Sequence, residues 1–187
     1  GQYTPAEANN RAIFLERLGL IYRGQEKYDL ALGVFKQMLA LGNSQAPRGE
    51  ALIVETLRLD RQPQKALEEL DSALKQYPIE RPLQMLKASL IGEQGHTDEA
   101  LHELNGMLNN TPADGEIYRA IAQIDSQARR FPSAEAAAQK ALNLSSKPDD
   151  QEYGHFLLGS IYERQKKYES AEQEFQKVLS VDPTSAQ

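Results

Sequence analysis

The sequence lacks several features that define common protein classes. It contains no cysteine in 187 residues, so it has neither a disulfide framework nor a thiolate for chemistry. No run of about 18 apolar residues occurs, and we therefore expect no helix that inserts into a membrane. No signal peptide is recognisable. Because the sequence opens with Gly1 rather than methionine, targeting information could have been removed, and the compartment stays open.

Basic charge is also scarce. Lysine and arginine number 21 against 27 aspartates and glutamates, which gives a formal net charge of −6. Proteins that bind nucleic acid or anionic membrane surfaces carry a basic footprint, because the partner's phosphates must be neutralised. We therefore expect no nucleic-acid partner.

Residue patterns that carry chemistry are missing as well. The three histidines, His96, His102 and His155, have no metal-ligand spacing to one another. The adjacent carboxylates Glu68-Glu69 and Asp149-Asp150 point in different directions on a helix. Neither a phosphate-binding glycine loop nor a nucleophile with a partner base can be recognised. The sequence thus predicts a protein that is not an enzyme and holds no metal or cofactor.

A fivefold internal repeat is present. Small residues recur at steps of 35, 34, 34 and 37 residues, at Ala31, Ala66, Ala100, Ala134 and Ala171. The residues four positions later are mostly bulky: Phe35, Leu70, Leu104, Ala138 and Phe175. The residues that precede the five alanines by twelve positions are mostly small: Gly19, Val54, Ala88, Ala122 and Gly159. A period near 34 residues indicates stacked supersecondary units, because one unit cannot bury its own apolar face.

Each copy is predicted to form two helices joined by a tight turn. In the last copy, Leu157, Leu158 and Ile161 follow the spacing of one helix face, and Asp182-Pro183 is expected to end the second helix. Gly19 and Gly159 predict close approach of two helices. At the other end, Thr4-Pro5-Ala6-Glu7 is the signature of a capped helix start. In the third copy we expect the second helix to start at Thr97 and the copy to end at Thr111-Pro112.

The best copies carry LGLIY at Leu18–Tyr22 and LGSIY at Leu158–Tyr162, each followed by an alanine, a phenylalanine and a helix end. The chain resembles the tetratricopeptide repeat family in these residues and in its period. The resemblance implies an all-α fold, an α-α superhelix, here a right-handed solenoid of helix-turn-helix repeats in one domain, 1–187. The copies would span about 12–45, 47–80, 81–114, 115–148 and 152–185. First helices would line the concave side and second helices the convex side.

Two places depart from a regular array. The fourth copy has Asp125 where the others have mostly large apolar residues, so we expect its apolar face to be rotated slightly. After the last copy only Thr184–Gln187 follows, and Phe175, Val178 and Leu179 cannot all be covered by the preceding copy. We expect either that the natural protein continues or that this uncapped repeat associates with another chain, which includes self-association.

The resemblance places a partner on non-core positions of the first helices. The candidate residues, from first copy to last, are Glu16, Arg23, Glu55, Arg58, Met85, Arg119, Gln123, Phe156, Ser160 and Glu163. The charged residues of this set would bind a polar peptide, or else form salt bridges with one another across the groove. Met85 and Phe156 would form a pocket for apolar side chains, or else pack between helices. No lysine or asparagine occurs on these inner positions, so the family's clamp for chaperone C-terminal tails is not matched.

The leading prediction is a non-catalytic module that binds a protein or peptide partner in its groove. The alternative is a regulatory or oligomerising segment of a larger protein, such as an enzyme. The sequence does not identify the partner.

Overall fold

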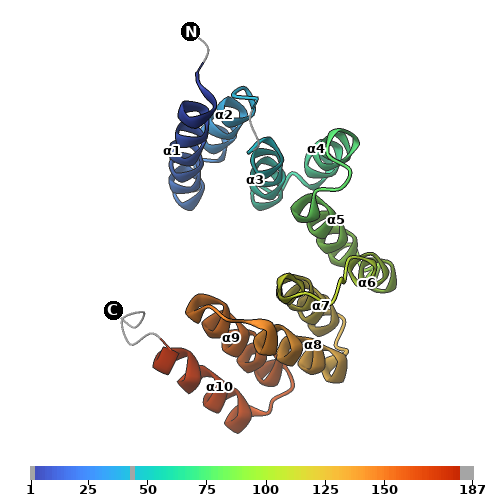
Figure 1. Ribbon diagram of the computed structural model, residues 1–187. Coiled ribbons are helices and arrows are strands. Elements are labelled where there is room, and N and C mark those ends of the chain that lie inside the picture. Colours follow the sequence, from blue (N-terminus) through green and yellow to red (C-terminus); the bar gives the residue numbers. More distant parts are fainter. Residues whose placement is uncertain (1–2, 43–44, 182–187) are drawn as a thin grey trace. The chain divides into compact units, whose positions relative to one another are not determined.

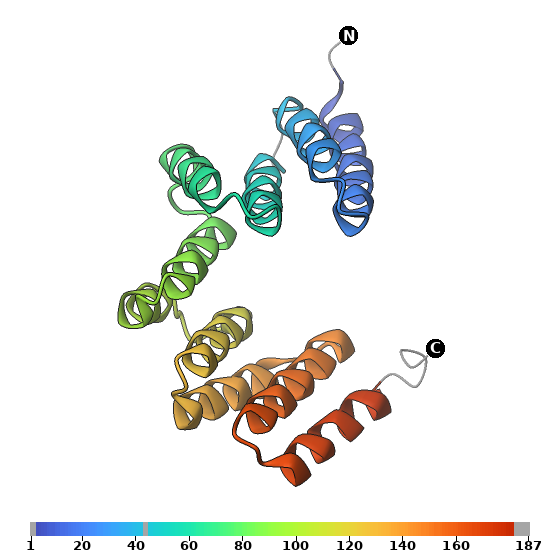
Figure 2. The same ribbon diagram turned by 180° about the vertical axis from the view of Figure 1, so that it is seen from behind.

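The computed structural model describes residues 3–42 and 45–181, and all regular elements in these ranges are helical (Figures 1 and 2). The helices of the first three copies are α1 (Pro5–Gly24), α2 (Tyr28–Leu39), α3 (Ala46–Leu59), α4 (Pro63–Gln76), α5 (Arg81–Glu93) and α6 (Thr97–Gly106). A short 3-10 helix, η1 (Pro112–Asp114), precedes α7 (Gly115–Gln127), α8 (Phe131–Leu144), α9 (Pro148–Arg164) and α10 (Tyr168–Val181). The expected helix end at Asp182-Pro183 lies outside the described residues.

The contacts divide the chain into two compact units, Gly1–Lys87 and Ala88–Gln187, with the boundary inside α5. In the N-terminal unit α2 packs on α1 and α3, and α3 packs on α4. In the C-terminal unit α7 packs on α6 and α8, and α9 packs on α8 and α10. Each of these helices thus packs on its neighbours along the chain, which defines an all-α helical-repeat solenoid. A single domain over 1–187 stays a prediction.

The helix start predicted at Thr4 is confirmed. The Thr4 hydroxyl accepts a hydrogen bond from the Glu7 backbone N–H at 3.4 Å, and the Glu7 carboxylate accepts one from the Thr4 N–H at 2.8 Å. Pro5 occupies the first turn, where a missing N–H costs nothing. The hydrogen bonds from Thr4 lower the pKa of Glu7 below its ordinary value, because they favour the charged form.

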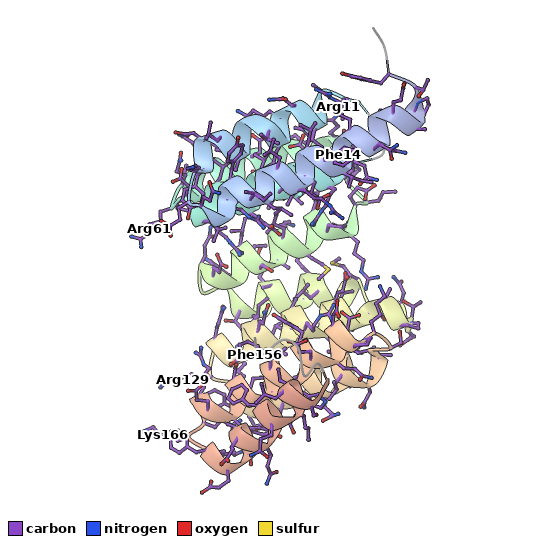
Figure 3. All side chains as sticks on the ribbon, turned by 90° about the vertical axis from the view of Figure 1, so that its left-hand side faces the viewer. Arg11, Phe14, Arg61, Arg129, Phe156 and Lys166 are labelled. Atoms are coloured by element: carbon purple, nitrogen blue, oxygen red, sulfur yellow. The ribbon has the colours of Figure 1, made fainter. Side chains whose placement is uncertain are left out.

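All five copies make the same turn between their two helices. One residue in each turn has a left-handed backbone with φ between 56° and 88°: Glu26, Arg61, Gly95, Arg129 and Lys166. Its N–H bonds a carbonyl three residues back, and the next N–H bonds a carbonyl five residues back, which is the Schellman motif. Arg61, Arg129 and Lys166 are labelled in Figure 3. The shared turn confirms the register of the repeats, including the divergent fourth copy.

The packing glycines are also confirmed. A Cβ atom on Gly19 would lie 2.6 Å from Cζ of Phe35, and one on Gly159 would lie 2.6 Å from Cε1 of Phe175. Each phenylalanine ring therefore fills the space over a glycine of the first helix in its own copy. This contact fixes how closely the paired helices approach.

In the middle of the chain, one helix ends before its copy does, and one expectation about an apolar face is wrong. Helix α6 ends at Gly106, and Thr111-Pro112 opens η1, because Asp114 Oδ2 accepts hydrogen bonds from the N–H groups of Asn109 and Thr111 and holds this segment in a turn. The apolar face of α7 is not rotated to expose Asp125, which is only 3% exposed. The turn at Arg129 includes a hydrogen bond from the Arg130 N–H to the Asp125 carbonyl. The equivalent hydrogen bond occurs in the other four copies, so Asp125 occupies the same position in the repeat as its equivalents there.

Candidate partner-binding surface

In the N-terminal unit, polar side chains join the first helices α1 and α3. Arg23 Nη1 lies 2.9 Å from Glu55 Oε2, and Arg48 Nη2 lies 2.9 Å from Glu16 Oε1. Glu16, Arg23 and Glu55, all predicted to contact a partner, are therefore engaged with neighbouring first helices. Half-exposed pairs of this kind contribute little stability, but they fix where the charges lie.

In the C-terminal unit, α7 and α9 are joined in the same way. Arg119 Nη1 lies 2.8 Å from Asp150 Oδ1, and the Arg119 guanidinium lies 5.7 Å from the centre of the Tyr153 ring. Gln123 Nε2 donates a hydrogen bond to the Tyr153 hydroxyl at 2.5 Å. Tyr153 is thus held by two predicted site residues, Arg119 and Gln123.

Aromatic side chains continue from this point along α9. The rings of Tyr153 and Phe156 have centres 6.5 Å apart, and those of Phe156 and Phe175 are 6.0 Å apart. Phe156, labelled in Figure 3, is 52% exposed although it is large and apolar. The C-terminal unit therefore presents an aromatic surface beside a fixed arginine. We call Arg119, Gln123, Tyr153 and Phe156 the aromatic surface.

The other predicted residues are less clearly grouped. Arg58 is half-buried on α3, and Met85 is half-buried on α5. Ser160 is half-buried and Glu163 is exposed, both on the C-terminal part of α9. Met85 belongs to the N-terminal unit and Phe156 to the C-terminal unit, so a pocket that uses both stays a prediction.

Sequence reasoning missed Arg48, Asp150 and Tyr153. Each partners a predicted residue at a separation of 30 to 32 positions, slightly less than one repeat. Adjacent first helices pair at this separation in both units. A search for complementary side chains about 31 residues apart would have found these residues.

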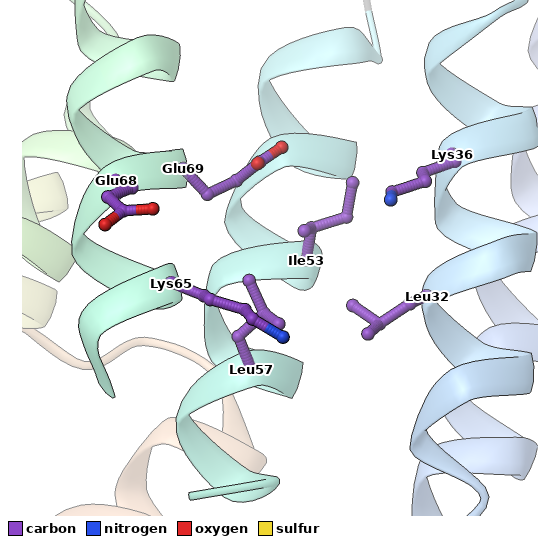
Figure 4. A pocket seen from close by; sticks show the side chains of 7 residues that line it. All are labelled: Leu32, Lys36, Ile53, Leu57, Lys65, Glu68 and Glu69. Atoms are coloured by element: carbon purple, nitrogen blue, oxygen red, sulfur yellow. The ribbon is translucent and has the colours of Figure 1, made fainter. Parts of the chain in front are cut away.

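A hollow of about 350 Å³ lies elsewhere on the N-terminal unit, between α2, α3 and α4 (Figure 4). Its apolar lining is Leu32, Ile53 and Leu57, and its charged lining is Lys36, Lys65, Glu68 and Glu69. Burial, together with the charge of Glu69 and a hydrogen bond to it, raises the pKa of Glu50 from 4.5 to about 7. Two carboxyl groups thus lie side by side near this hollow.

Metal-binding clusters and membrane-spanning helices are both absent from residues 3–42 and 45–181. In these ranges no group of three or more His, Asp or Glu side chains is placed to hold a metal ion. Nor does this part of the chain contain a helix that is both long and apolar enough to cross a bilayer.

Comparison with known proteins places this architecture in a class. Family models described as tetratricopeptide repeat match residues 15–48 and 152–185, the first and last copies. A thermophilic tetratricopeptide repeat protein of Thermus thermophilus superposes with a TM-score of 0.73 at 20% identity, over 92% of each chain. PilF of Pseudomonas aeruginosa superposes with a TM-score of 0.64 at 16% identity, over 94% of this chain and 78% of that one.

A curated relative is the general transcriptional corepressor ssn6 of Schizosaccharomyces pombe. It is 29% identical over 121 residues, which are 64% of this chain and 11% of that protein. The chain therefore corresponds to a small part of this relative.

By these findings the chain is an all-α helical-repeat solenoid, a kind of fold that typically serves as a non-catalytic scaffold for protein interactions. Within that class, the chain is a tetratricopeptide repeat protein.

Proposed function

We propose that the chain binds a peptide or protein segment without catalysing a reaction, and that the aromatic surface of the C-terminal unit is the site. The observation that carries this proposal is the 52% exposure of Phe156 next to Tyr153, whose ring lies against an arginine held by Asp150. Aromatic and arginine side chains contribute most at protein interfaces, because they bury large areas at a small entropic cost.

The geometry suggests what the partner must offer. Phe156 and Tyr153 give an apolar and aromatic platform, which an apolar side chain of the partner would cover. Arg119 and Gln123 carry N–H donors beside the platform, which suit carbonyl or carboxylate oxygens of the same segment. Since Asp150 already holds Arg119, the donor is positioned before the partner arrives, and less entropy is lost on binding. The pairs of the N-terminal unit, Glu16–Arg48 and Arg23–Glu55, are the second candidate for polar contacts.

The test is selection of binders from a random peptide library, followed by titration of the best peptide. We expect Phe156→Ser and Arg119→Ala each to weaken its affinity at least about tenfold, which is 1.4 kcal/mol. Ile79→Ser is the matched control, because Ile79 is an apolar side chain that is 85% exposed in the N-terminal unit. Circular dichroism checks that all variants are folded. Equal affinity for the wild type and both surface variants would rule out the aromatic surface.

The alternative, a regulatory or oligomerising segment of a larger protein, rests on a separate observation. The match to ssn6 covers only 11% of that relative. Failure to select any peptide from the library would favour this alternative.

A further inference from the structure

The outer side of α1 exposes large apolar side chains in a row. Phe14 is 71% exposed, and Leu18 and Ile21 are also exposed. We call these three residues the receiving face. They are spaced by four and three residues and therefore lie on one side of the helix.

The same positions are buried in other copies. In α3 they are Gly49, Ile53 and Thr56, and in α9 they are Gly154, Leu158 and Ile161, all buried.

A leucine of the preceding second helix packs on this row in both units. Leu39 of α2 would lie 2.7 Å from a Cβ on Gly49, and Leu142 of α8 would lie 2.8 Å from a Cβ on Gly154. The receiving face is thus the side on which a repeat accepts the second helix of the repeat before it.

The last helix carries the matching leucine. Leu39 and Leu142 each stand eight residues after the small residue of their copy, Ala31 and Ala134. The residue eight positions after Ala171 is Leu179, on α10. Leu179 is 56% exposed. The C-terminal unit therefore displays the leucine that in other copies packs on the following first helix.

A polar contact also joins the fourth copy to the fifth. Glu135 of α8 accepts hydrogen bonds from Gln165 Nε2 at 2.5 Å and from Lys167 Nζ at 3.2 Å, in the turn between α9 and α10. By repeat register, Glu135 corresponds to Glu172 on α10. Gln165 and Lys167 correspond to Gln25 and Lys27, in the turn after α1.

These end residues are accessible. Glu172, Gln25 and Lys27 are all exposed. The two ends of the chain thus carry opposite halves of the contact that joins the fourth copy to the fifth, with identical residue types in its polar part.

We infer that α10 of one copy of this chain packs on α1 of a second copy, head to tail, by repeating the contact between α8 and α9. Leu179 packs beside Phe14, and Glu172 bonds Gln25 and Lys27 of the second copy. Phe14 replaces a glycine, so Leu179 cannot sit directly over the backbone. A hollow of about 400 Å³ beside the ring receives it, lined by Tyr3, Glu7, Asn10, Arg11, Phe14, Leu15 and Leu18. Because each copy carries both faces, the contact is heterologous and can join more than two copies.

Sedimentation velocity tests the inference on the wild-type chain over about a hundredfold range of concentration, in which mass action must raise the mean mass. Phe14→Glu blocks the receiving face and Leu179→Glu blocks α10, so each variant alone is expected to be monomeric. Mixed in equal amounts, the two variants retain one working face each and should form dimers but nothing larger. Ile79→Glu, a charge at an exposed apolar side chain away from both faces, should associate like the wild type.

Charge reversal gives a second arm. Lys27→Glu and Glu172→Lys should each weaken association about fivefold, and the double variant should regain most of the loss. Lys166→Glu, also an exposed turn lysine, is the matched control and should have no effect.

Three results would overturn the inference. If the wild-type chain stays monomeric at every concentration, the receiving face and α10 do not join copies of this chain. Blocked variants that stay apart when mixed would exclude the head-to-tail contact. Association that survives Phe14→Glu or Leu179→Glu in a folded protein would place the interface elsewhere.

Discussion

Asp125 is an acidic side chain at a core position of α7. Its Oδ1 atom is buried and has no hydrogen-bond partner. Burial raises the pKa of Asp125 above its ordinary value, although the nearby charge of Arg130 acts in the opposite direction. A buried carboxyl group in this position costs free energy that an apolar side chain would not.

Asp125→Leu is therefore expected to raise the free energy of unfolding by about 1–2 kcal/mol at pH 7. The pKa of Asp125 is higher in the folded than in the unfolded state, so binding of its proton stabilises the fold. This stabilisation is complete at pH values below the pKa of the unfolded state and is lost as pH rises through the pKa of the folded state. The gain from the substitution should thus shrink at acidic pH. Urea denaturation at several pH values measures it, with the exposed Asp71→Leu as control. A loss of stability in Asp125→Leu would show that attraction to Arg130 outweighs burial.

Glu50 gives a second prediction at the residue scale. Its pKa is raised from 4.5 to about 7 by burial and by Glu69, so the folded protein favours the protonated form. The stability that this proton provides is complete below about pH 4.5 and is lost as pH rises through about 7. Glu50→Gln should raise the free energy of unfolding at pH 8 by about 1 kcal/mol, because solvent screens part of the effect, and should change it little at pH 5.

Thermal unfolding at pH 5 and pH 8 measures this difference. Glu68→Gln is the control, since Glu68 lines the same hollow but is exposed. An equal effect of Glu50→Gln at both pH values would contradict the account.

At the scale of the helix pair, glycine has opposite roles on the two helices of one copy. A Cβ on Gly19 would lie 2.6 Å from Cζ of the Phe35 ring, whereas one on Gly33 would meet nothing within 4 Å. Gly19→Ala should lower the free energy of unfolding by about 2 kcal/mol, because Phe35 must move. Gly33→Ala should raise it by about 0.5–1 kcal/mol, because alanine favours the helix. Chemical denaturation of both variants tests this, and changes of the same sign would contradict the packing described.

Two equivalent turn residues allow a similar comparison of glycine with a residue that has a side chain. Arg129 holds a left-handed backbone with φ 61°, whereas Gly95 holds the equivalent turn with φ 88°. Arg129→Gly should raise the free energy of unfolding by about 0.5–1 kcal/mol, since glycine adopts this conformation without steric cost. Gly95→Ala should lower it by about 1 kcal/mol. Both changes are measured by thermal unfolding, and a stabilising Gly95→Ala would refute the assignment of strain to these turns.

Helix pairs are also the scale at which the sequence was most informative. The period of Ala31, Ala66 and their equivalents predicts the five copies, and the Thr4 cap and the packing of Gly19 are confirmed because each depends on local residue types. The end of α6 could not be predicted, because it depends on Asp114, which lies in the next segment and holds the N–H groups of Asn109 and Thr111.

The candidate site was predicted only in part, for a related reason. Arg119, Gln123 and Phe156 were found from their positions in the repeat. Their partners Asp150 and Tyr153 lie on the next first helix, about 30 residues away, and only packing of α7 beside α9 brings them together. The exposure of Phe156 likewise depends on how much of its ring the neighbouring helices cover.

At the scale of the whole molecule, different surfaces are proposed to have different roles. The aromatic surface of the C-terminal unit is proposed to bind a peptide, while the receiving face and α10 are proposed to join copies. The two proposals use different residues, so Phe14→Glu should leave peptide affinity unchanged. Phe156→Ser in turn should leave the association of copies unchanged.

The most direct test of the proposed function is hydrogen–deuterium exchange of the chain with and without the selected peptide, in the Phe14→Glu background to prevent self-association. We expect slower exchange in α7 and α9, with little change in α1 and α2, because a bound segment would cover Phe156 and Tyr153. Protection confined to the N-terminal unit, or none in α7 and α9 with the peptide bound, would contradict the account.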